Sequence, residues 1–305
     1  MIKEHNIEDR NITGQFISKK EKLKRFFSEN NSVKLTIITI NYNNNSGLIK
    51  TIESIINQTW SDFEFIIIDG GSTDESLSTI KKYDKHINYW ISERDNGIYD
   101  AMNKGIQLAK GTFVNFMSSG NYYYTNTILE EIHDKFRNDV GILYGDSSCF
   151  NEAGYDRVEK TPSKLTFSHF VTSGINHQAS FIKRDLFFKY FLYNTEYKIS
   201  SKWEFFIYVI CKRNEPYEHL QKTICNYDFS GISPIPKKLY IYHQERETIM
   251  KKYFSSFYED FEYYNTVIDP RIRKVFRIKN NKILWTVLKA FTSIFIFILP
   301  KKDTL

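Results

Sequence analysis

Residues 35–74 read LTIITINYNNNSGLIKTIESIINQTWSDFEFIIIDGGSTD, and this stretch decides the fold. It opens with a β-branched run at 35–40, which is typical of a parallel strand buried on both faces. Apolar residues then recur at helical spacing over 47–58, and a second apolar run follows at 63–68. The pattern predicts a strand, a helix and a second strand, which is one βαβ unit.

The alternation continues downstream. We expect helices at 76–83, at 98–110 and after 126, and strands at 87–91, 113–117 and 140–145. Strands that alternate with helices predict a parallel sheet whose ligands bind at the carboxyl ends of the strands. Beyond residue 150 the sequence becomes irregular and rich in turns, as expected for a part that holds an acceptor.

These changes of pattern divide the chain. We expect an N-terminal helical extension at 1–33 and a catalytic domain at 34–235, followed by a helical, basic and apolar tail at 236–305. Within this domain the regular alternation covers residues 34–146, and the irregular part covers residues 147–235. The length of 305 residues and the hydrophobic content of 41% suit one catalytic domain with extensions.

Composition narrows the class of protein. The three cysteines lack CxxC spacing, so neither a disulfide framework nor a zinc site is indicated. The formal charge is +6, but residues 271–305 hold nine Lys or Arg against one Asp, so the positive charge belongs to the tail. This distribution disfavours nucleic acid as a partner. Residues 1–30 are polar and charged, unlike an export signal, and we expect a cytoplasmic protein.

The segment D-G-G-S-T-D at 69–74 ends the second strand with a carboxylate, two glycines and helix-capping residues. Such a turn lets the backbone approach a ligand while Asp69 accepts a hydrogen bond. The first strand ends in Thr39, Asn41 and Asn43, which should lie beside Asp69 and form a nucleoside pocket across two strand ends. An ordinary strand-to-helix turn with an N-cap explains the same segment equally well.

The order strand, N-Y-N, helix, strand and D-G-G-S-T-D resembles the opening of family 2 glycosyltransferases. The segment SERDNGIYDAMNKG at 92–105, followed by AKG at 109–111, is similar to the donor-side helix of bacterial members that build surface polysaccharides. The resemblance covers about residues 34–235, and it implies a donor half at 34–146 and an acceptor half at 147–235. It implies an α/β fold of the GT-A type, a mostly parallel Rossmann-like sheet flanked by helices, with the C-terminal helical extension added to it.

The resemblance also implies roles for single residues. Asp69 would read the uracil of a UDP-sugar, and the edge from Thr39 to Asn43 would close over the base. Asp95 and Asp100 would face the sugar-diphosphate, and the donor set further includes Lys104 and Gly120. For Asp100 the alternative is an i,i+4 ion pair with Lys104 on an exposed helix.

The chain departs from the family at two places. Members that need a metal carry an acidic motif where this chain reads Ser118-Ser119-Gly120-Asn121, and its last Asp holds Mn or Mg. Asn121 offers a neutral carbonyl oxygen instead, so metal binding should be weakened but is not excluded. The second departure is Lys202, which stands where inverting members carry the carboxylate base that deprotonates the acceptor hydroxyl.

Three alternatives remain for the missing base. Glu204 replaces it if the backbone is shifted, Lys202 loses its proton through burial, or Lys202 acts as a cation on the diphosphate in place of the metal. His177, in the family-like segment INHQASF at 175–181, is a further candidate base or a hydrogen-bond donor to the diphosphate. A satisfied structural histidine is the alternative for His177.

The apolar run at 283–299 is 17 residues long, contains Lys289 and is flanked by basic residues. It lies at the lower limit for a bilayer span, and we expect an interfacial anchor on the anionic inner face of the cell membrane. A helix packed on the protein core is the alternative.

The sequence thus predicts transfer from a UDP-sugar to a surface glycan or a lipid-linked acceptor. The rival prediction is a catalytically impaired member that serves as a nucleotide-sugar-binding or partner subunit. The donor sugar, the linkage and the oligomeric state stay open.

Overall fold

The computed structural model describes residues 33–151, 154–228, 236–260, 263, 270–279 and 281–298. The expected N-terminal helix at 1–33 lies almost wholly outside these residues. The chain divides into two compact units, which are described separately. Unit 1 comprises residues 1–163, 176–196 and 215–233, and unit 2 comprises residues 164–175, 197–214 and 234–305.

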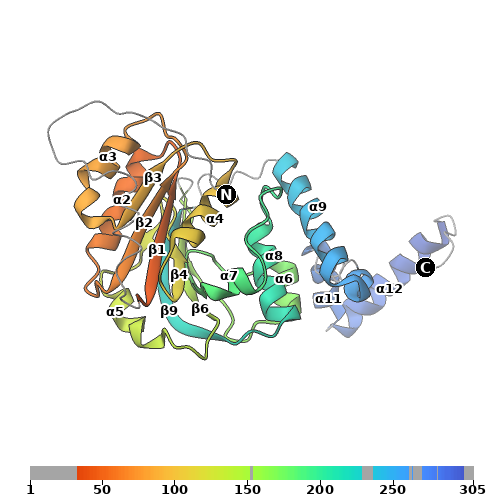
Figure 1. The fold of residues 1–305 in the computed structure, drawn as a ribbon. Coiled ribbons are helices and arrows are strands. Elements are labelled where there is room, and N and C mark those ends of the chain that lie inside the picture. Colours follow the sequence, from red (N-terminus) through yellow and green to blue (C-terminus); the bar gives the residue numbers. More distant parts are fainter. Residues whose placement is uncertain are drawn as a thin grey trace. The chain divides into compact units, whose positions relative to one another are not determined.

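Unit 1 contains all strands of the described residues, arranged in one sheet in the order β3-β2-β1-β4-β8-β6-β9-β5, with β7 paired to β6 (Figure 1). The strands are β1 (Leu35–Asn41), β2 (Phe63–Asp69), β3 (Tyr89–Ser92), β4 (Phe113–Phe116), β5 (Tyr122–Tyr123), β6 (Ile142–Phe150), β7 (Asp156–Glu159), β8 (Ser180–Lys183) and β9 (Tyr217–Asp228). The first four strands are parallel, and β8 is antiparallel to both of its neighbours. The expected α/β fold of the GT-A type is confirmed.

Helices connect these strands. In unit 1 they are α2 (Asn45–Ile56), α3 (Ser76–Lys82), η1 (Asp84–His86), α4 (Ile98–Leu108), α5 (Ile128–Ile132), η2 (His133–Lys135) and α7 (Asp185–Lys189). Every residue of β1 is buried, as the run of β-branched side chains predicts for a strand covered on both faces.

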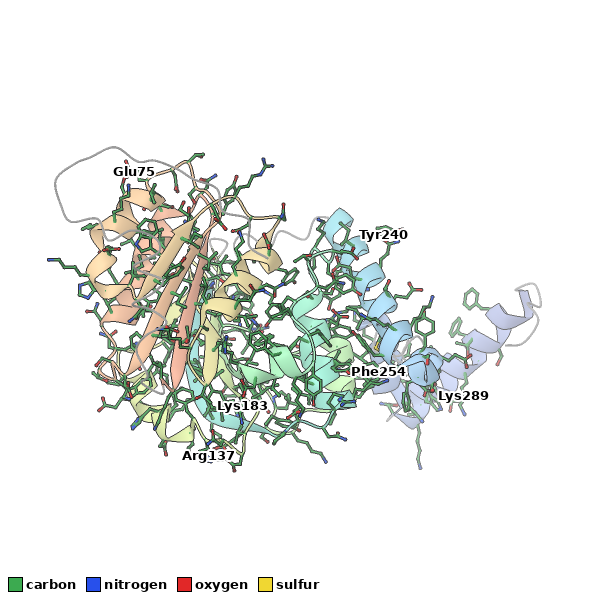
Figure 2. The ribbon with its side chains drawn as sticks, in the orientation of Figure 1. Glu75, Arg137, Lys183, Tyr240, Phe254 and Lys289 are labelled. Atoms are coloured by element: carbon green, nitrogen blue, oxygen red, sulfur yellow. The ribbon has the colours of Figure 1, made fainter. Side chains whose placement is uncertain are left out.

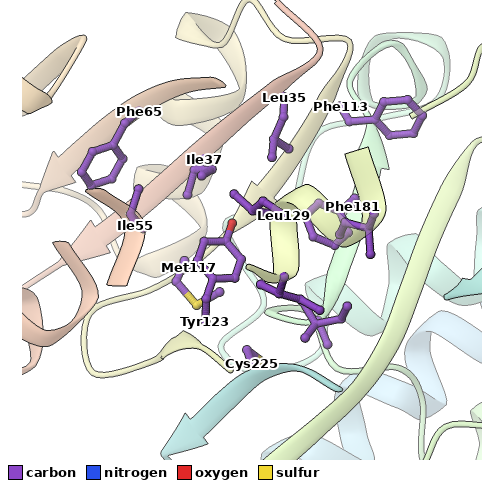
Figure 3. Close-up of a cluster of buried hydrophobic side chains, with 14 of the residues drawn as sticks. Leu35, Ile37, Ile55, Phe65, Phe113, Met117, Tyr123, Leu129, Phe181 and Cys225 are labelled. Atoms are coloured by element: carbon purple, nitrogen blue, oxygen red, sulfur yellow. The ribbon is translucent and has the colours of Figure 1, made fainter. Parts of the chain in front are cut away.

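One face of the sheet packs against α2 and α5 through a cluster that includes Ile37, Ile55, Phe65 and Leu129 (Figure 3). On the other face α4 approaches β1 closely. A Cβ on Gly105 would lie 2.6 Å from Cγ2 of Ile38, so only glycine fits there. This packing fixes the strand ends of unit 1, where the predicted donor residues lie.

Unit 2 consists of helices in the described residues. They are α6 (Phe167–Thr172), α8 (Ser201–Ile207), the π-helical turn η3 (Tyr208–Lys212), α9 (Pro236–Tyr253), η4 (Ser255–Phe257), α11 (Pro270–Lys279) and α12 (Lys282–Ile298). Phe254, which directly follows α9 (Figure 2), packs against Phe167 of α6 with ring centroids 5.3 Å apart and ring planes tilted by 58°. The expected helical tail is therefore present, and its apolar run coincides with α12.

No helix in the described part of the chain has the length and apolarity that a bilayer span requires. Several apolar side chains of α12 are nevertheless exposed, among them Phe291 at 57% and Phe295 at 62%.

Candidate functional site

The predicted donor residues gather at the carboxyl edge of three neighbouring strands in unit 1. Asn41 is the register partner of Asp69, and Asp69 is the register partner of Ser92. This confirms that the ends of the first two strands meet, as parallel pairing requires. Ser92 was not among the residues predicted to contribute.

The carboxylate of Asp69 is fully buried and accepts four hydrogen bonds. Oδ1 accepts from Nδ2 of Asn41 at 2.8 Å and from Oγ of Ser72 at 2.5 Å. Oδ2 accepts from the backbone N–H of Ser72 at 2.9 Å and from Oγ of Ser92 at 2.6 Å. Because two oxygens offer about four acceptor positions, Asp69 is saturated inside the turn. Direct recognition of a base by Asp69 stays a prediction that would require one of these bonds to break.

The side chains of Thr39 and Asn43 also form hydrogen bonds within unit 1. Thr39 is buried, and its hydroxyl donates to the carbonyl of Met117 at 2.9 Å. Asn43 has a positive φ of 48°, and its Oδ1 accepts from the backbone N–H of Thr73 at 2.7 Å. Both residues hold the strand ends together, and their contact with a ligand stays a prediction. Asn41 differs, since its Oδ1 is buried with no hydrogen-bond partner among the described residues.

Gly70 is closely approached by two side chains at this edge. A Cβ there would lie 3.2 Å from Oδ2 of Asp95 and 3.3 Å from Cδ2 of Tyr42. Tyr42 is 65% exposed, so an aromatic face and a carboxylate oxygen flank a position with no side chain. Tyr42 lies within the N-Y-N segment, but its exposure and its proximity to Asp95 were not predictable from that segment.

Lys104 lies among three carboxylates. Its Nζ is 2.5 Å from Oδ1 of Asp95, 3.0 Å from Oε1 of Glu93 and 3.7 Å from Oδ2 of Asp100. Burial raises the pKa of Asp95, and the hydrogen bond from Lys104 opposes this rise. Burial works against protonation of Lys104, but its bonds to Asp95 and Glu93 raise its pKa above the ordinary value. The Lys104 ammonium therefore neutralises carboxylates of its own unit.

Asp100 also has a local task. Its Oδ2 accepts from the backbone N–H of Asn96 at 2.9 Å and closes the loop before α4, where Gly97 has a φ of 111°. The alternative of an Asp100 to Lys104 ion pair is observed at 3.7 Å. A role of Asp100 toward a sugar-diphosphate stays a prediction.

The loop from Ser118 to Asn121 is hydrogen-bonded to Thr51 in the middle of α2. The N–H of Gly120 donates to Oγ1 of Thr51 at 3.0 Å, and that hydroxyl lies 2.7 Å from the Asn121 carbonyl oxygen. Asn121 is buried, and both the oxygen and the nitrogen of its side-chain amide form hydrogen bonds. Oδ1 accepts from the N–H of Asp228 at 3.0 Å, and Nδ2 donates to the Ser118 carbonyl at 3.2 Å.

A divalent cation beside a diphosphate favours charged oxygen ligands. Within the described residues there is no group of three or more His, Cys, Asp or Glu side chains that could hold a metal ion. Asn121 is neutral, and its Oδ1 points to the N–H of Asp228. The described residues therefore do not fit a metal site at this loop.

His177 is 4% exposed in unit 1. Its Nε2 lies 2.7 Å from the hydroxyl of Tyr193, and its ring stacks on Phe116 with centroids 4.7 Å apart. These contacts agree with the structural alternative stated for His177. Its action as a base stays a prediction.

The two residues at the predicted base position lie on α8 of unit 2. Glu204 is 1% exposed, and its Oε1 accepts from the Tyr253 hydroxyl at 3.0 Å and from Nζ of Lys252 at 3.2 Å. Lys202 has no hydrogen bond or ion pair with any described residue, and burial lowers its pKa. Glu204 is thus engaged within its own unit, whereas Lys202 is a cation without a counter-charge in the described part.

Helix α8 is held rigidly by α9. The Glu245 carboxylate accepts the backbone N–H groups of Ile199 at 3.1 Å and Ser200 at 2.8 Å, just before α8 begins. Arg246 lies between the rings of Trp203 and Tyr242, with its guanidinium carbon 4.3 and 4.2 Å from their centroids. These contacts fix the backbone on either side of Lys202.

The sheet topology is that of the expected GT-A fold. Residues 36–199 match the sequence profile described as "Glycosyl transferase family 2". This match covers more than half of the chain, and the chain belongs to that family.

Two relatives illustrate the relationship. A PGL/p-HBAD biosynthesis glycosyltransferase of Mycobacterium bovis (strain BCG / Pasteur 1173P2) is 29% identical over 196 residues, which cover 60% of this chain and 72% of that protein. An uncharacterized glycosyltransferase of Mycobacterium tuberculosis (strain ATCC 25618 / H37Rv) is 29% identical over 205 residues, covering 65% of this chain and 76% of that protein.

Solved structures agree on the fold. The S. aureus TarS 1-349 structure in complex with UDP has a TM-score of 0.55 at 18% identity, covering 72% of this chain and 63% of that chain. TarS 1-349 in complex with UDP-GlcNAc has a TM-score of 0.53 at 19% identity, covering 64% and 58%. This chain spans less than two thirds of either structure's length, and at this identity the likeness shows the fold alone.

Proposed function

We propose that this chain binds a UDP-sugar at the carboxyl edge of β1, β2 and β3 and transfers the sugar to a surface glycan or a lipid-linked acceptor. The observation that carries the proposal is the placement of the exposed ring of Tyr42 and of Oδ2 of Asp95 beside Gly70, at the carboxyl edge of the parallel strands. An aromatic face stacks on a pyrimidine, and a carboxylate oxygen accepts from its N–H. The buried and unpartnered Oδ1 of Asn41 supports the proposal, because such acceptors are normally satisfied.

The roles at the edge follow from the contacts. Asp69, Asn43 and Thr39 hold the strand ends in register, while Asp95 and Tyr42 face the nucleoside. Lys104 keeps Asp95 in place. This division shifts recognition of the base from Asp69, the residue implied by the family resemblance, toward Asp95.

Lys202 carries the proposal for catalysis. It occupies the family's base position and has no counter-charge in the described part of unit 2. We propose that Lys202 acts as a cation on the leaving diphosphate, since the chain has lost a carboxylate at 121 and gained a cation at 202. Action of a neutral Lys202 as the base is the rival, and the two differ in their pH dependence.

The tail of unit 2 is proposed to hold the enzyme at an anionic lipid surface. On α12 the apolar side chains Ile283, Val287, Phe291 and Phe295 recur every four residues and are exposed. Basic side chains are exposed on α11 and α12, namely Lys274, Arg277, Lys279, Lys282 and Lys289. Figure 2 labels Lys289 on α12. An apolar stripe with flanking positive charge is typical of an interfacial helix on anionic lipid.

Calorimetric titration with UDP tests the donor site. We expect saturable binding to the wild-type protein, loss of binding in Asp95→Ala, and weaker binding in Tyr42→Ala. The control is Tyr124→Ala, which removes another exposed tyrosine of unit 1. Absence of UDP binding by the folded wild-type protein would refute the donor site.

Transfer is tested separately by UDP release from UDP-hexoses and UDP-N-acetylhexosamines in the presence of membrane extracts. UDP binding without any release from either donor class would favour the rival function of a nucleotide-sugar-binding subunit.

A further inference from the structure

In the loop at 118–121, Asn121 stands where metal-dependent family members carry an aspartate, and its side chain is used in hydrogen bonds within unit 1. In this chain Asn121 is a connector between two strands. Its Oδ1 accepts from the N–H of Asp228 at the end of β9, and its Nδ2 donates to Ser118 within the loop. The second bond requires an amide, because a carboxylate has no N–H to donate to the Ser118 carbonyl.

The rest of the loop is equally bound. The N–H of Ser119 donates to the carbonyl of Ile40 at 3.0 Å, and Nδ2 of Asn44 donates to the Ser119 carbonyl at 3.2 Å. Gly120 and Asn121 bond to Thr51 of α2. The loop therefore has its shape before any ligand binds, and it gets that shape from neutral hydrogen bonds.

An ion at this loop would have to displace these bonds. Oδ1 of Asn121 would need to turn from the Asp228 N–H toward the cation, which leaves this partly buried N–H without its partner. The neutral oxygen would return less than the carboxylate that divalent cations favour. Other carboxylates of unit 1, Glu93, Asp95 and Asp100, are paired with Lys104.

We infer that this chain binds its nucleotide diphosphate without a divalent cation, and that Asn121 is a positioning residue that joins the Ser118–Asn121 loop to β9. The inference rests on the proposed UDP-sugar site. It is consistent with a lysine, and not a metal, meeting the charge of the leaving group.

The experiment is titration of the full-length protein with UDP in buffer containing either MnCl2 or EDTA. For the wild-type protein we expect the same Kd in both buffers, within about twofold. For Asn121→Asp we expect Mn to tighten UDP binding by about tenfold or more, since the change restores a charged ligand. Electron paramagnetic resonance of Mn in the presence of UDP should detect bound metal in Asn121→Asp and none in the wild-type protein.

Two control variants test whether a response to Mn comes from a metal ligand at position 121, from the loss of the Asn121 hydrogen bonds or from nonspecific attraction of Mn. Asn121→Ala removes the connecting bonds without adding a ligand, and we expect weaker UDP binding with no response to Mn. Asn226→Asp places a carboxylate on the neighbouring β9, where Asn226 donates to the Tyr123 carbonyl at 3.4 Å, and reports any nonspecific attraction of Mn. We expect no response to Mn in this variant either.

The outcomes are distinct. Binding of UDP to the wild-type protein only in Mn, or at least tenfold tighter in Mn, would overturn the inference and leave the proposed donor site intact. Absence of UDP binding in both buffers would overturn the donor site and the inference together.

Discussion

Nδ2 of Asn41 donates to Oδ1 of Asp69 at 2.8 Å, and this bond joins the ends of two parallel strands whose residues are register partners. The same carboxylate accepts from Ser72 and Ser92, so three segments of unit 1 converge on one buried anion. Hydrogen bonds to a charged acceptor are about twice as strong as neutral ones. The strand edge thus depends on the acceptor capacity of Asp69.

Asp69→Asn should therefore destabilise the strand edge and abolish UDP binding. The amide would present an N–H to at least one of the donors that now point at the carboxylate, at a cost of about 1–3 kcal/mol. The free energy of unfolding is measured by urea denaturation, and UDP binding by calorimetry. Asp62→Asn, in the exposed segment before β2, is the matched control. A variant as stable as the wild-type protein would contradict the role given to Asp69.

The parallel strands and helices of unit 1 were predictable because their apolar periodicity is strong. The strand β9 was not, since Tyr217–Asp228 alternates weakly and many of its polar residues are partly exposed. Its assignment depends on pairing with β6 and β5, which lie far away in the sequence. The regular secondary structure beyond residue 150 therefore exceeds what the sequence indicated.

The sequence indicated which positions belong to the candidate site, but it did not indicate their hydrogen-bond partners. The sequence showed that Asn121 replaces a carboxylate, but its bond to Asp228 spans 107 residues. Likewise, Ser92 reaches Asp69 from 23 residues away, which saturates the carboxylate that the resemblance assigns to the base. Contacts of this kind arise from tertiary packing, which motifs and periodicity do not encode.

Lys104→Met should move the acidic limb of UDP binding to higher pH. Burial already raises the pKa of Asp95, and removal of the Lys104 ammonium removes an interaction that lowers it. Binding that needs the Asp95 carboxylate is lost as the pH falls through this pKa, so the loss should begin at higher pH in the variant. Calorimetric titrations with UDP across the acidic range check the shift. Lys81→Met on α3 removes one exposed charge elsewhere and should leave the limb in place.

Lys202→Arg and Lys202→Met distinguish a cation from a base. If Lys202 acts as a cation, transfer falls as the pH rises through its pKa, which burial holds below the ordinary value. Arginine should then retain transfer, and methionine should lower kcat by about 10²–10³. If a neutral Lys202 acts as the base, the rate rises through the same pKa and both variants lose transfer. Initial rates of UDP release against pH decide between the two.

Lys202 has a consequence for stability as well. Because folding lowers its pKa, the unfolded chain binds the proton more readily, and stability rises with pH between the folded and the unfolded pKa of this lysine. Below that window the charged group costs stability. Lys202→Met should therefore raise Tm at neutral pH, as measured by scanning calorimetry. An unchanged or lower Tm would show that the ammonium is adequately solvated in the folded protein.

Gly105→Ala should destabilise unit 1 through overpacking. The added Cβ would lie 2.6 Å from Cγ2 of Ile38, which is buried in the sheet and has little room to move. Overpacking of this kind costs about 1–3 kcal/mol, more than alanine gains over glycine in helix propensity. Urea denaturation gives the free energy of unfolding. Gln107→Ala, at an exposed position of the same helix, should change it little, and equal effects at both positions would contradict the packing argument.

The stripe on α12 should control attachment to lipid. We expect the full-length protein to sediment with vesicles of phosphatidylcholine and phosphatidylglycerol and to remain in solution with phosphatidylcholine alone. Phe291→Ser with Phe295→Ser should weaken attachment to the anionic vesicles, because each change removes an exposed aromatic side chain that would be buried in the interface. Lys274→Glu with Arg277→Glu should weaken it too, and more strongly at low salt, because charge attraction is screened by salt.

The control is Tyr263→Ser, which removes an exposed aromatic residue outside α12. Equal sedimentation with both vesicle types, or a wild-type dimer that the two Phe changes dissociate in light scattering, would contradict the lipid surface and assign the stripe to another partner.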